Sequence, residues 1–139
     1  KIYSLAGVRC GYGFAPVELA EAIDKVRAPF NVSTVAQVGA YHSLKDTDEL
    51  KRRHDENARE RALLQSALDT LEIPHAVSQT NFVWAYVKDS KAAFDALLKE
   101  GVIVRDFGGG GALRVGVGSP YDTETAVAAF AKLRDEGVI

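Results

Sequence analysis

The chain has 139 residues, of which 47% are hydrophobic and 26% are charged, and its formal net charge at pH 7 is -2. A chain of this length buries roughly two-thirds of its unfolded surface on folding, which is enough for a substantial core. The two signs of charge are interspersed, so composition gives no electrostatic reason to expect a nucleic acid or a membrane as partner.

The single cysteine, Cys10, excludes an intramolecular disulfide. No apolar run is long enough to span a bilayer and nothing resembles a secretory leader, so we expect a cytoplasmic protein. The chain starts at Lys1 without a methionine, and we expect it to be a piece of a longer polypeptide.

The first third of the chain predicts one strand and two helices. Apolar residues mixed with three glycines over Leu5–Ala15 predict a buried strand whose backbone lies close to another group. Pro16 and the apolar spacing after it predict a helix over residues 16–27. Pro29 ends that helix, and Ser33 is a suitable N-cap for a second helix through about Leu44.

Residues 46–71 predict one long helix with two different halves. The first half, residues 47–61, is almost wholly charged, so we expect it to be solvated or to bridge between two bodies. The second half has a face that can enter a core. Its apolar residues recur at helical spacing: Leu63, Leu64, Ala67, Leu68 and Leu71.

Residues 73–139 predict a compact α+β unit. We expect strands over residues 81–87, 102–107 and 112–118, and helices over residues 91–101 and 121–137. Asp122 or Thr123 is the expected cap of the last helix. The four glycines at 108–111 lie between two strands, which favours a hairpin tip over a phosphate-binding loop.

Few other residues suggest chemistry. His42, His54 and His75 do not have the spacing of a metal site and are expected to be structural or solvated. Cys10 is expected to be a small core residue. The glycines at 11 and 13 do not make a dinucleotide-binding motif because position 16 is Pro.

Three arginines lie inside apolar segments and need anionic or carbonyl partners, because guanidinium groups are rarely buried alone. Small neighbours around Arg9 and Arg114 leave room for a ligand. For Arg105 two interpretations are equally open: a ligand contact, or an ion pair with an acid such as Asp106 or exposure to water at a sheet edge.

The segment KIYSLAGVRCGYG closely resembles the cofactor-lysine region of fold-type I aminotransferases, in which a lysine is followed by small residues and then Gly-x-Arg-x-Gly. The later segments APFNVSTVAQ, SQTNFVW, GVIVRDF and LRVGVGSP resemble, in the same order, the C-terminal part of the histidinol-phosphate and aromatic amino acid aminotransferase group. Two positions depart from that pattern: Trp84 stands where many histidinol-phosphate enzymes have an aliphatic residue, and Ser119 replaces the usual threonine before Pro120.

The resemblance implies a role for four residues. Lys1 matches the catalytic lysine that binds pyridoxal 5'-phosphate covalently and moves the substrate proton. Arg9 matches the arginine that binds the cofactor phosphate. Arg114 matches the arginine that binds the substrate carboxylate, and Arg105 matches a second substrate-binding arginine, associated with the substrate phosphate.

The resemblance also implies a fold and an activity. The fold is α/β, fold type I, with the C-terminal part of the large domain in residues 1–45, a long connecting helix in residues 46–72 and a small α+β domain in residues 73–139. The implied protein is a homodimeric aminotransferase of histidine biosynthesis that acts on histidinol phosphate, with small amino and keto acids as substrates, although these residues alone are expected to be inactive. Alternatives are an aromatic amino acid (phenylalanine) aminotransferase, a decarboxylase of the same fold, or a structural fragment without activity.

Overall fold

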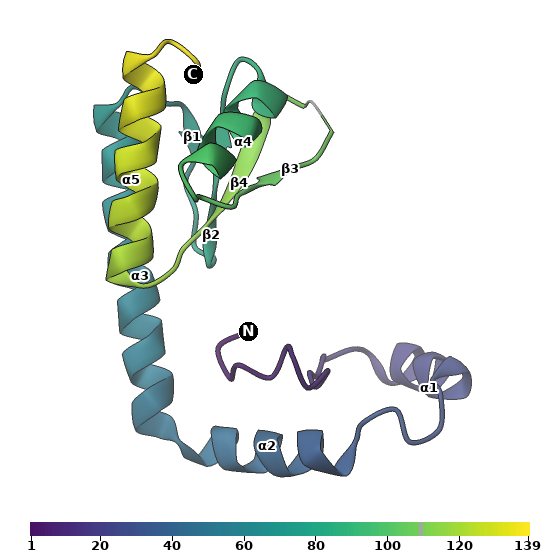
Figure 1. The fold of residues 1–139 in the computed structure, drawn as a ribbon. Coiled ribbons are helices and arrows are strands. Elements are labelled where there is room, and N and C mark those ends of the chain that lie inside the picture. Colours follow the sequence, from purple (N-terminus) through teal and green to yellow (C-terminus); the bar gives the residue numbers. More distant parts are fainter. Residues whose placement is uncertain (109) are drawn as a thin grey trace. The chain divides into compact units, whose positions relative to one another are not determined.

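The computed structural model describes residues 1–108 and 110–139. The chain divides into two compact units, Lys1–His54 and Asp55–Ile139 (Figure 1). Helix α3, Thr47–Thr70, confirms the long helix that the sequence predicts, and the division falls within it. No helix among the described residues is long and apolar enough to cross a membrane.

The first unit contains two of the predicted helices, α1 (Val17–Val26) and α2 (Thr34–Lys45). Ser33 caps α2 as expected, because its side-chain oxygen accepts a hydrogen bond from the backbone N–H of Ala36 at 3.2 Å. Within residues 1–54, all of which the structure describes, Ala36 is the one buried residue. This unit therefore has almost no core of its own.

The predicted strand over Leu5–Ala15 is wrong. The segment consists of turns and irregular extended backbone, and its hydrogen bonds are local: Arg9 N–H donates to Ala6 O at 3.3 Å, and Cys10 N–H donates to Leu5 O at 3.3 Å. A strand requires a neighbouring strand to complete its hydrogen bonds, and none of the described strands pairs with this segment. An apolar pattern alone does not supply that partner.

Helix α3 enters the core through residues spaced four apart. Leu64 and Leu68 are each 1% exposed, whereas Leu63 is 54% exposed and lies outside the face to which the sequence assigned it. Glu60 is also buried, although the charged half of the predicted helix was expected to be solvated or to bridge between two bodies. It lies one turn before Leu64 on the same face, and Arg59 Nε pairs with its carboxylate at 2.9 Å.

The second unit is a four-stranded antiparallel sheet with helices on one face (Figure 1). The strand order is β1-β2-β4-β3. The remaining elements are β1 (His75–Ala76), β2 (Phe82–Tyr86), α4 (Ser90–Lys99), β3 (Arg105–Asp106), β4 (Ala112–Gly116) and α5 (Pro120–Asp135). Strand β1 was not predicted, because two residues are too short to show any periodicity.

The core lies between this sheet and helices α3, α4 and α5. Alternate residues of β2 and β4 enter it, and the buried helix residues pack against them. The members of this cluster include Leu64, Leu68, Val83, Ala85, Ala93, Leu97, Leu113, Val115, Ala129, Phe130 and Leu133. The opposite face of the sheet is not covered by any of these three helices.

The predicted strand over residues 102–107 is shorter than expected. Only Arg105 and Asp106 pair with β4, opposite Arg114 and Leu113. The β3 and β4 strands are consecutive and antiparallel, as a hairpin requires, but Gly109 at its predicted tip lies outside the described residues.

The cap of α5 is Ser119, not Asp122 or Thr123 as the sequence predicted. Ser119 Oγ accepts from Asp122 N–H at 3.3 Å, and Asp122 Oδ2 accepts from Ser119 N–H at 2.8 Å. The two residues thus form a reciprocal capping box. Hydrogen bonds from the Ser119 side chain and then its backbone hold the pKa of Asp122 below its usual value.

Candidate active site

The open face of the sheet carries the residues that could recognise a ligand. Because side chains alternate along a strand, burial of Val83, Leu113 and their neighbours places the intervening residues on the other face. Trp84 on β2, Arg114 on β4 and Arg105 on β3 are aligned across it, since Trp84 and Arg105 are both register partners of Arg114.

Arg105 and Arg114 are brought together without an acidic partner. Neither makes a hydrogen bond or ion pair to any residue that the structure describes. The ion pair between Arg105 and Asp106 is excluded by geometry: Asp106 faces the other side of the strand, where its carboxylate accepts from Ser90 Oγ at 2.9 Å. Two like charges directly opposite on neighbouring strands repel, so this arrangement favours an anionic ligand.

Aromatic rings surround the two guanidinium groups. Arg105 Cζ lies 5.4 Å and Arg114 Cζ 5.8 Å from the centre of the Phe107 ring. Arg114 Cζ also lies 5.4 Å from the Phe82 ring. The Trp84 and Phe107 rings are 5.3 Å apart, with a tilt of 32°. These distances are within the range of cation–π and aromatic contacts.

Helix α3 fixes the segment that leads into β2. Asn57 Nδ2 and Arg61 Nη1 both donate to Thr80 O, at 3.3 and 3.0 Å. Gln65 Oε1 accepts from Ser78 N–H at 2.8 Å. These three helix residues are spaced four apart and so share one face, which anchors the start of the strand that carries the open-face aromatic residues.

Lys1 lies in the first unit, at the edge of a cavity of about 660 Å³. Its side chain makes no hydrogen bond or ion pair with any described residue. Cys10, Tyr12 and Leu44 also line this cavity. Cys10 is half-buried rather than a core residue as predicted.

Arg9 is not among the residues that line this cavity. Its φ of 59° places it in the left-handed region, which is uncommon for a residue other than glycine. Its Nη1 donates to Ala6 O at 2.8 Å, and its side chain has no acidic partner among the described residues. The guanidinium is exposed and retains free donors for an anion.

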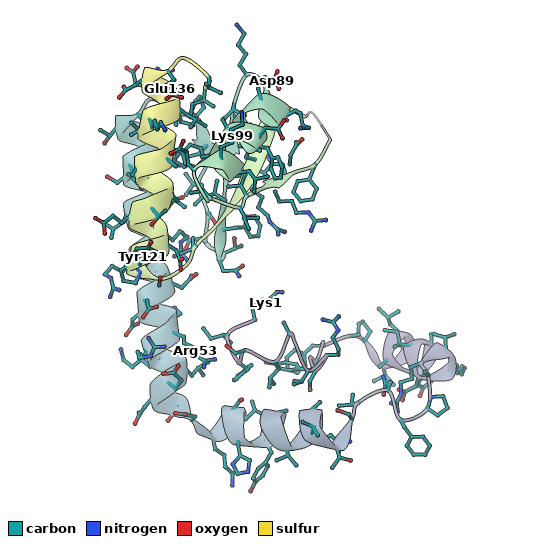
Figure 2. All side chains as sticks on the ribbon, viewed as in Figure 1. Lys1, Arg53, Asp89, Lys99, Tyr121 and Glu136 are labelled. Carbon is teal, nitrogen blue, oxygen red and sulfur yellow. The ribbon has the colours of Figure 1, made fainter. Side chains whose placement is uncertain are left out.

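A charged cluster that the sequence analysis missed holds the segment next to Lys1. Arg53, labelled with Lys1 in Figure 2, donates to Ile2 O at 3.2 Å and to Ser4 Oγ at 2.5 Å. Its Nε pairs with Glu49 at 2.7 Å. Hydrogen bonds from Arg52 and then Arg53 lower the pKa of Glu49 to about 2. Arginines within a charged helix carry no sequence signal for such a contact.

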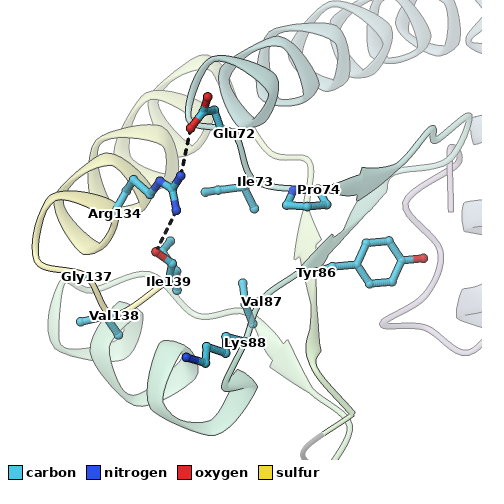
Figure 3. A pocket seen from close by; sticks show the side chains of 10 residues that line it. All are labelled: Glu72, Ile73, Pro74, Tyr86, Val87, Lys88, Arg134, Gly137, Val138 and Ile139. Carbon is cyan, nitrogen blue, oxygen red and sulfur yellow. Dashed lines mark hydrogen bonds and ion pairs between the residues drawn. The ribbon is translucent and has the colours of Figure 1, made fainter.

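A second hollow, of about 480 Å³, lies beside the end of α5 (Figure 3). Its one arginine, Arg134, is already paired with Glu72 at 3.1 Å and donates to Ile139 O at 3.4 Å. The rest of the lining is largely apolar, with Lys88 at its rim, and none of the predicted site residues belongs to it. The open sheet face is therefore the better candidate for an anionic substrate.

The sequence is similar to a known family and to known proteins. The profile of the family "Aminotransferase class I and II" matches residues 1–130. The histidinol-phosphate aminotransferase of Moorella thermoacetica is 36% identical over 137 residues, which are 96% of this chain and 36% of that protein. The enzyme of the same name from Anaeromyxobacter sp. is 40% identical over 138 residues, covering 96% of this chain and 38% of that protein.

Solved structures share the fold of this chain. Histidinol-phosphate aminotransferase from Sinorhizobium meliloti, crystallised in complex with pyridoxal-5'-phosphate, matches with a TM-score of 0.85 and 27% identity, covering 98% of this chain and 39% of that one. The predicted fold class is confirmed: the chain has the α/β fold of pyridoxal-phosphate-dependent transferases of fold type I.

The chain spans a little over a third of the length of the curated relatives that it matches. The family profile nevertheless covers most of its residues. This chain belongs to the aminotransferase class I and II family.

Proposed function

We propose that the protein containing this chain is a pyridoxal-phosphate-dependent aminotransferase that acts on histidinol phosphate in histidine biosynthesis. The main observation behind the proposal is that Arg105 and Arg114 are neighbours on the open sheet face, and that neither guanidinium pairs with a described carboxylate. Arginine forks suit carboxylate and phosphate groups, and both occur on the substrates of this reaction. The similarity to two proteins named histidinol-phosphate aminotransferase supports the proposal.

Pyridoxal 5'-phosphate would supply an electron-withdrawing ring. In the proposal, Lys1 holds the cofactor aldehyde through its ε-amine and afterwards moves the proton at the substrate Cα. A free amine at the edge of a cavity of about 660 Å³ fits that role. Arg9 binds the cofactor phosphate, which its exposed guanidinium can contact with the N–H groups not used by Ala6 O.

In the proposal, each of the two sheet arginines binds a different anionic group of the substrates. Arg114 binds the α-carboxylate of the amino donor glutamate, and Arg105 binds the phosphate of histidinol phosphate or of imidazole-acetol phosphate. Arg114 is half-buried between two rings, whereas Arg105 lies exposed on the edge strand. The exposed arginine has room for the larger and more hydrated phosphate group.

A second candidate is an aromatic amino acid aminotransferase acting on phenylalanine. The observation that favours it is the pair of rings, Trp84 and Phe107, beside Arg114 on the same face. A flat side chain could stack on such a pair. The two candidates share the roles of Lys1, Arg9 and Arg114 and differ in whether Arg105 binds a substrate group.

We further propose a cytoplasmic homodimer. Residues 1–54 bury one side chain, while Leu19, Ile23 and Val26, which share one face of α1, are each half exposed or more. An apolar helix face of this kind is stabilised when other protein covers it. The mass of the full-length protein by light scattering tests the dimer, and a monomer at micromolar concentration would contradict it.

The function is tested by assaying the full-length protein with histidinol phosphate and with phenylalanine. We expect turnover of histidinol phosphate with glutamate formed from 2-oxoglutarate. Arg105→Ala should lower the efficiency with histidinol phosphate about 10- to 150-fold, because a hydrogen bond to a charged group contributes about 1.5–3 kcal/mol. The efficiency with phenylalanine should change little.

A control variant and an absorption measurement complete the test. Lys99→Ala, at an exposed lysine of α4 (Figure 2), removes a cation from the same unit and should leave both activities unchanged. Lys1→Ala should remove the borohydride-sensitive absorption of the bound cofactor. Equal losses for both substrates in Arg105→Ala would contradict the phosphate role, and release of CO2 instead of a keto acid would indicate a decarboxylase.

A further inference from the structure

Phe107 occupies a central place on the open face that core packing does not explain. It follows β3 directly, is 55% exposed and lies outside the hydrophobic core cluster. Its ring nevertheless contacts Arg105, Arg114 and Trp84. These contacts link an exposed phenylalanine to three large side chains of one face.

The two arginines need such a contact to stay in place. They are register partners on β3 and β4, so their Cβ atoms are about 4.5–5.5 Å apart and their charges repel. No described carboxylate holds either guanidinium. The rings are thus the groups that can restrain both heads, and Phe107 is the ring that both share.

The position of Phe107 depends on side chains rather than on the strand ladder. The ladder between β3 and β4 includes Arg105 and Asp106 but not Phe107. Gly108, the next residue, has φ +91°, so the chain turns immediately after the ring. Trp84, on the far side of Arg114, packs against Phe107 and supports it.

We propose that Phe107 is a positioning residue that holds both substrate-binding guanidinium groups ready for anions. The inference rests on the proposed function for the identity of the anions but not for the positioning itself. If both guanidinium groups are already restrained before binding, less conformational entropy is lost when the anion binds, and the affinity is higher. Phe82 contacts Arg114 but is not among the rings that contact Arg105, so it provides an internal comparison.

The test uses the cofactor-loaded full-length enzyme and four variants. Phe107→Leu removes the ring at similar volume, and Phe107→Tyr keeps it. Phe82→Leu removes the ring that Arg114 alone contacts. Tyr121→Leu removes an aromatic residue that is 75% exposed at the start of α5 (Figure 2) and serves as the matched control.

For Phe107→Leu we expect the dissociation constant of inorganic phosphate, measured by calorimetry, to rise about five- to tenfold, because the two released guanidinium groups must then be ordered when phosphate binds. The KM values for glutamate and for histidinol phosphate should rise by a similar factor, with kcat within about twofold. Phe82→Leu should raise the KM for glutamate only. Phe107→Tyr and Tyr121→Leu should behave like the wild type.

The outcomes separate this inference from the proposed function. An active wild-type enzyme in which Phe107→Leu changes neither phosphate affinity nor KM would overturn the inference and leave the function intact. A wild-type protein without transamination that binds phosphate, and binds it more weakly in Phe107→Leu, would support the inference and overturn the function. A change in kcat alone, or a loss that Phe107→Tyr does not rescue, also counts against positioning.

Discussion

Two leucines of α3 provide a stringent test of the packing in the second unit. Leu68 is 1% exposed in the core, and Leu63 is 54% exposed five residues earlier. Changing either to alanine removes the same atoms from the same helix, and the gain in helix propensity is the same small amount. The difference between the two variants therefore measures burial.

The magnitude follows from the burial of each side chain. Leu68→Ala loses about 0.8 kcal/mol for each of three buried carbon groups, and the cavity that remains raises the total to about 2.7–5 kcal/mol. Leu63 is about half exposed, so Leu63→Ala should lose about half of that transfer free energy, about 1 kcal/mol, and leave no cavity. Urea unfolding of the full-length protein, followed by circular dichroism, measures both. Equal losses in the two variants would refute the orientation described for α3.

Three further outcomes are expected. Gly118→Ala should destabilise the protein, because a Cβ there would lie 2.6 Å from the Cβ and Oδ2 of Asp122 and would disrupt the cap of α5. Gly116→Ala is the control, since a Cβ there would meet open space. Thermal unfolding should show a smaller loss of stability for Gly116→Ala than for Gly118→Ala. Ser90→Ala should cost about 1.5–3 kcal/mol in urea unfolding, because it removes the hydroxyl that donates to the β3 aspartate; a neutral result would contradict that bond. The pKa of Glu49 falls from 4.5 to about 2, so its stabilising contribution is present above about pH 4.5 and is lost as the pH falls through about 2. Glu49→Gln should therefore flatten the decline of the unfolding midpoint in that window, and an unchanged pH profile would contradict the pairing.

The helices were largely predictable from sequence, because each carries its own local signals. Pro16, Ser33 and the glycine after α4 mark helix ends through backbone chemistry that needs no distant partner. The cap of α5 was assigned three or four residues too late because Asp122 is itself a good cap residue. Its actual role, as the third helical residue of a capping box, depends on Ser119.

Strands and exposure were less predictable, because they depend on residues far away in the sequence. The apolar segment from Leu5 to Ala15 has the composition of a strand but pairs with no described strand. Leu63 and Leu64 differ by one position and have the same composition signal, yet one is exposed and the other buried. Which side of α3 meets the sheet is set by tertiary packing.

The candidate site was predicted in part. The sequence favoured a ligand role for Arg114 and left Arg105 open between a ligand contact and an ion pair or exposure to water, and the structure places the two residues side by side. The roles of Lys1 and Arg9 follow from the resemblance and remain proposals. Phe107 was missed because a phenylalanine at the end of an apolar segment suggests a core residue, and its contacts become visible only when the two strands are paired.

The two edge strands of the sheet, β1 and β3, are each only two residues long. An incoming strand from another chain would find few backbone groups to pair with at either edge, and at β3 it would meet the charged pair Arg105 and Asp106. Growth of this sheet from one molecule to the next is therefore disfavoured. Assembly with other protein should use helix faces such as that of α1, and aggregation through strand addition should be slow even at high concentration.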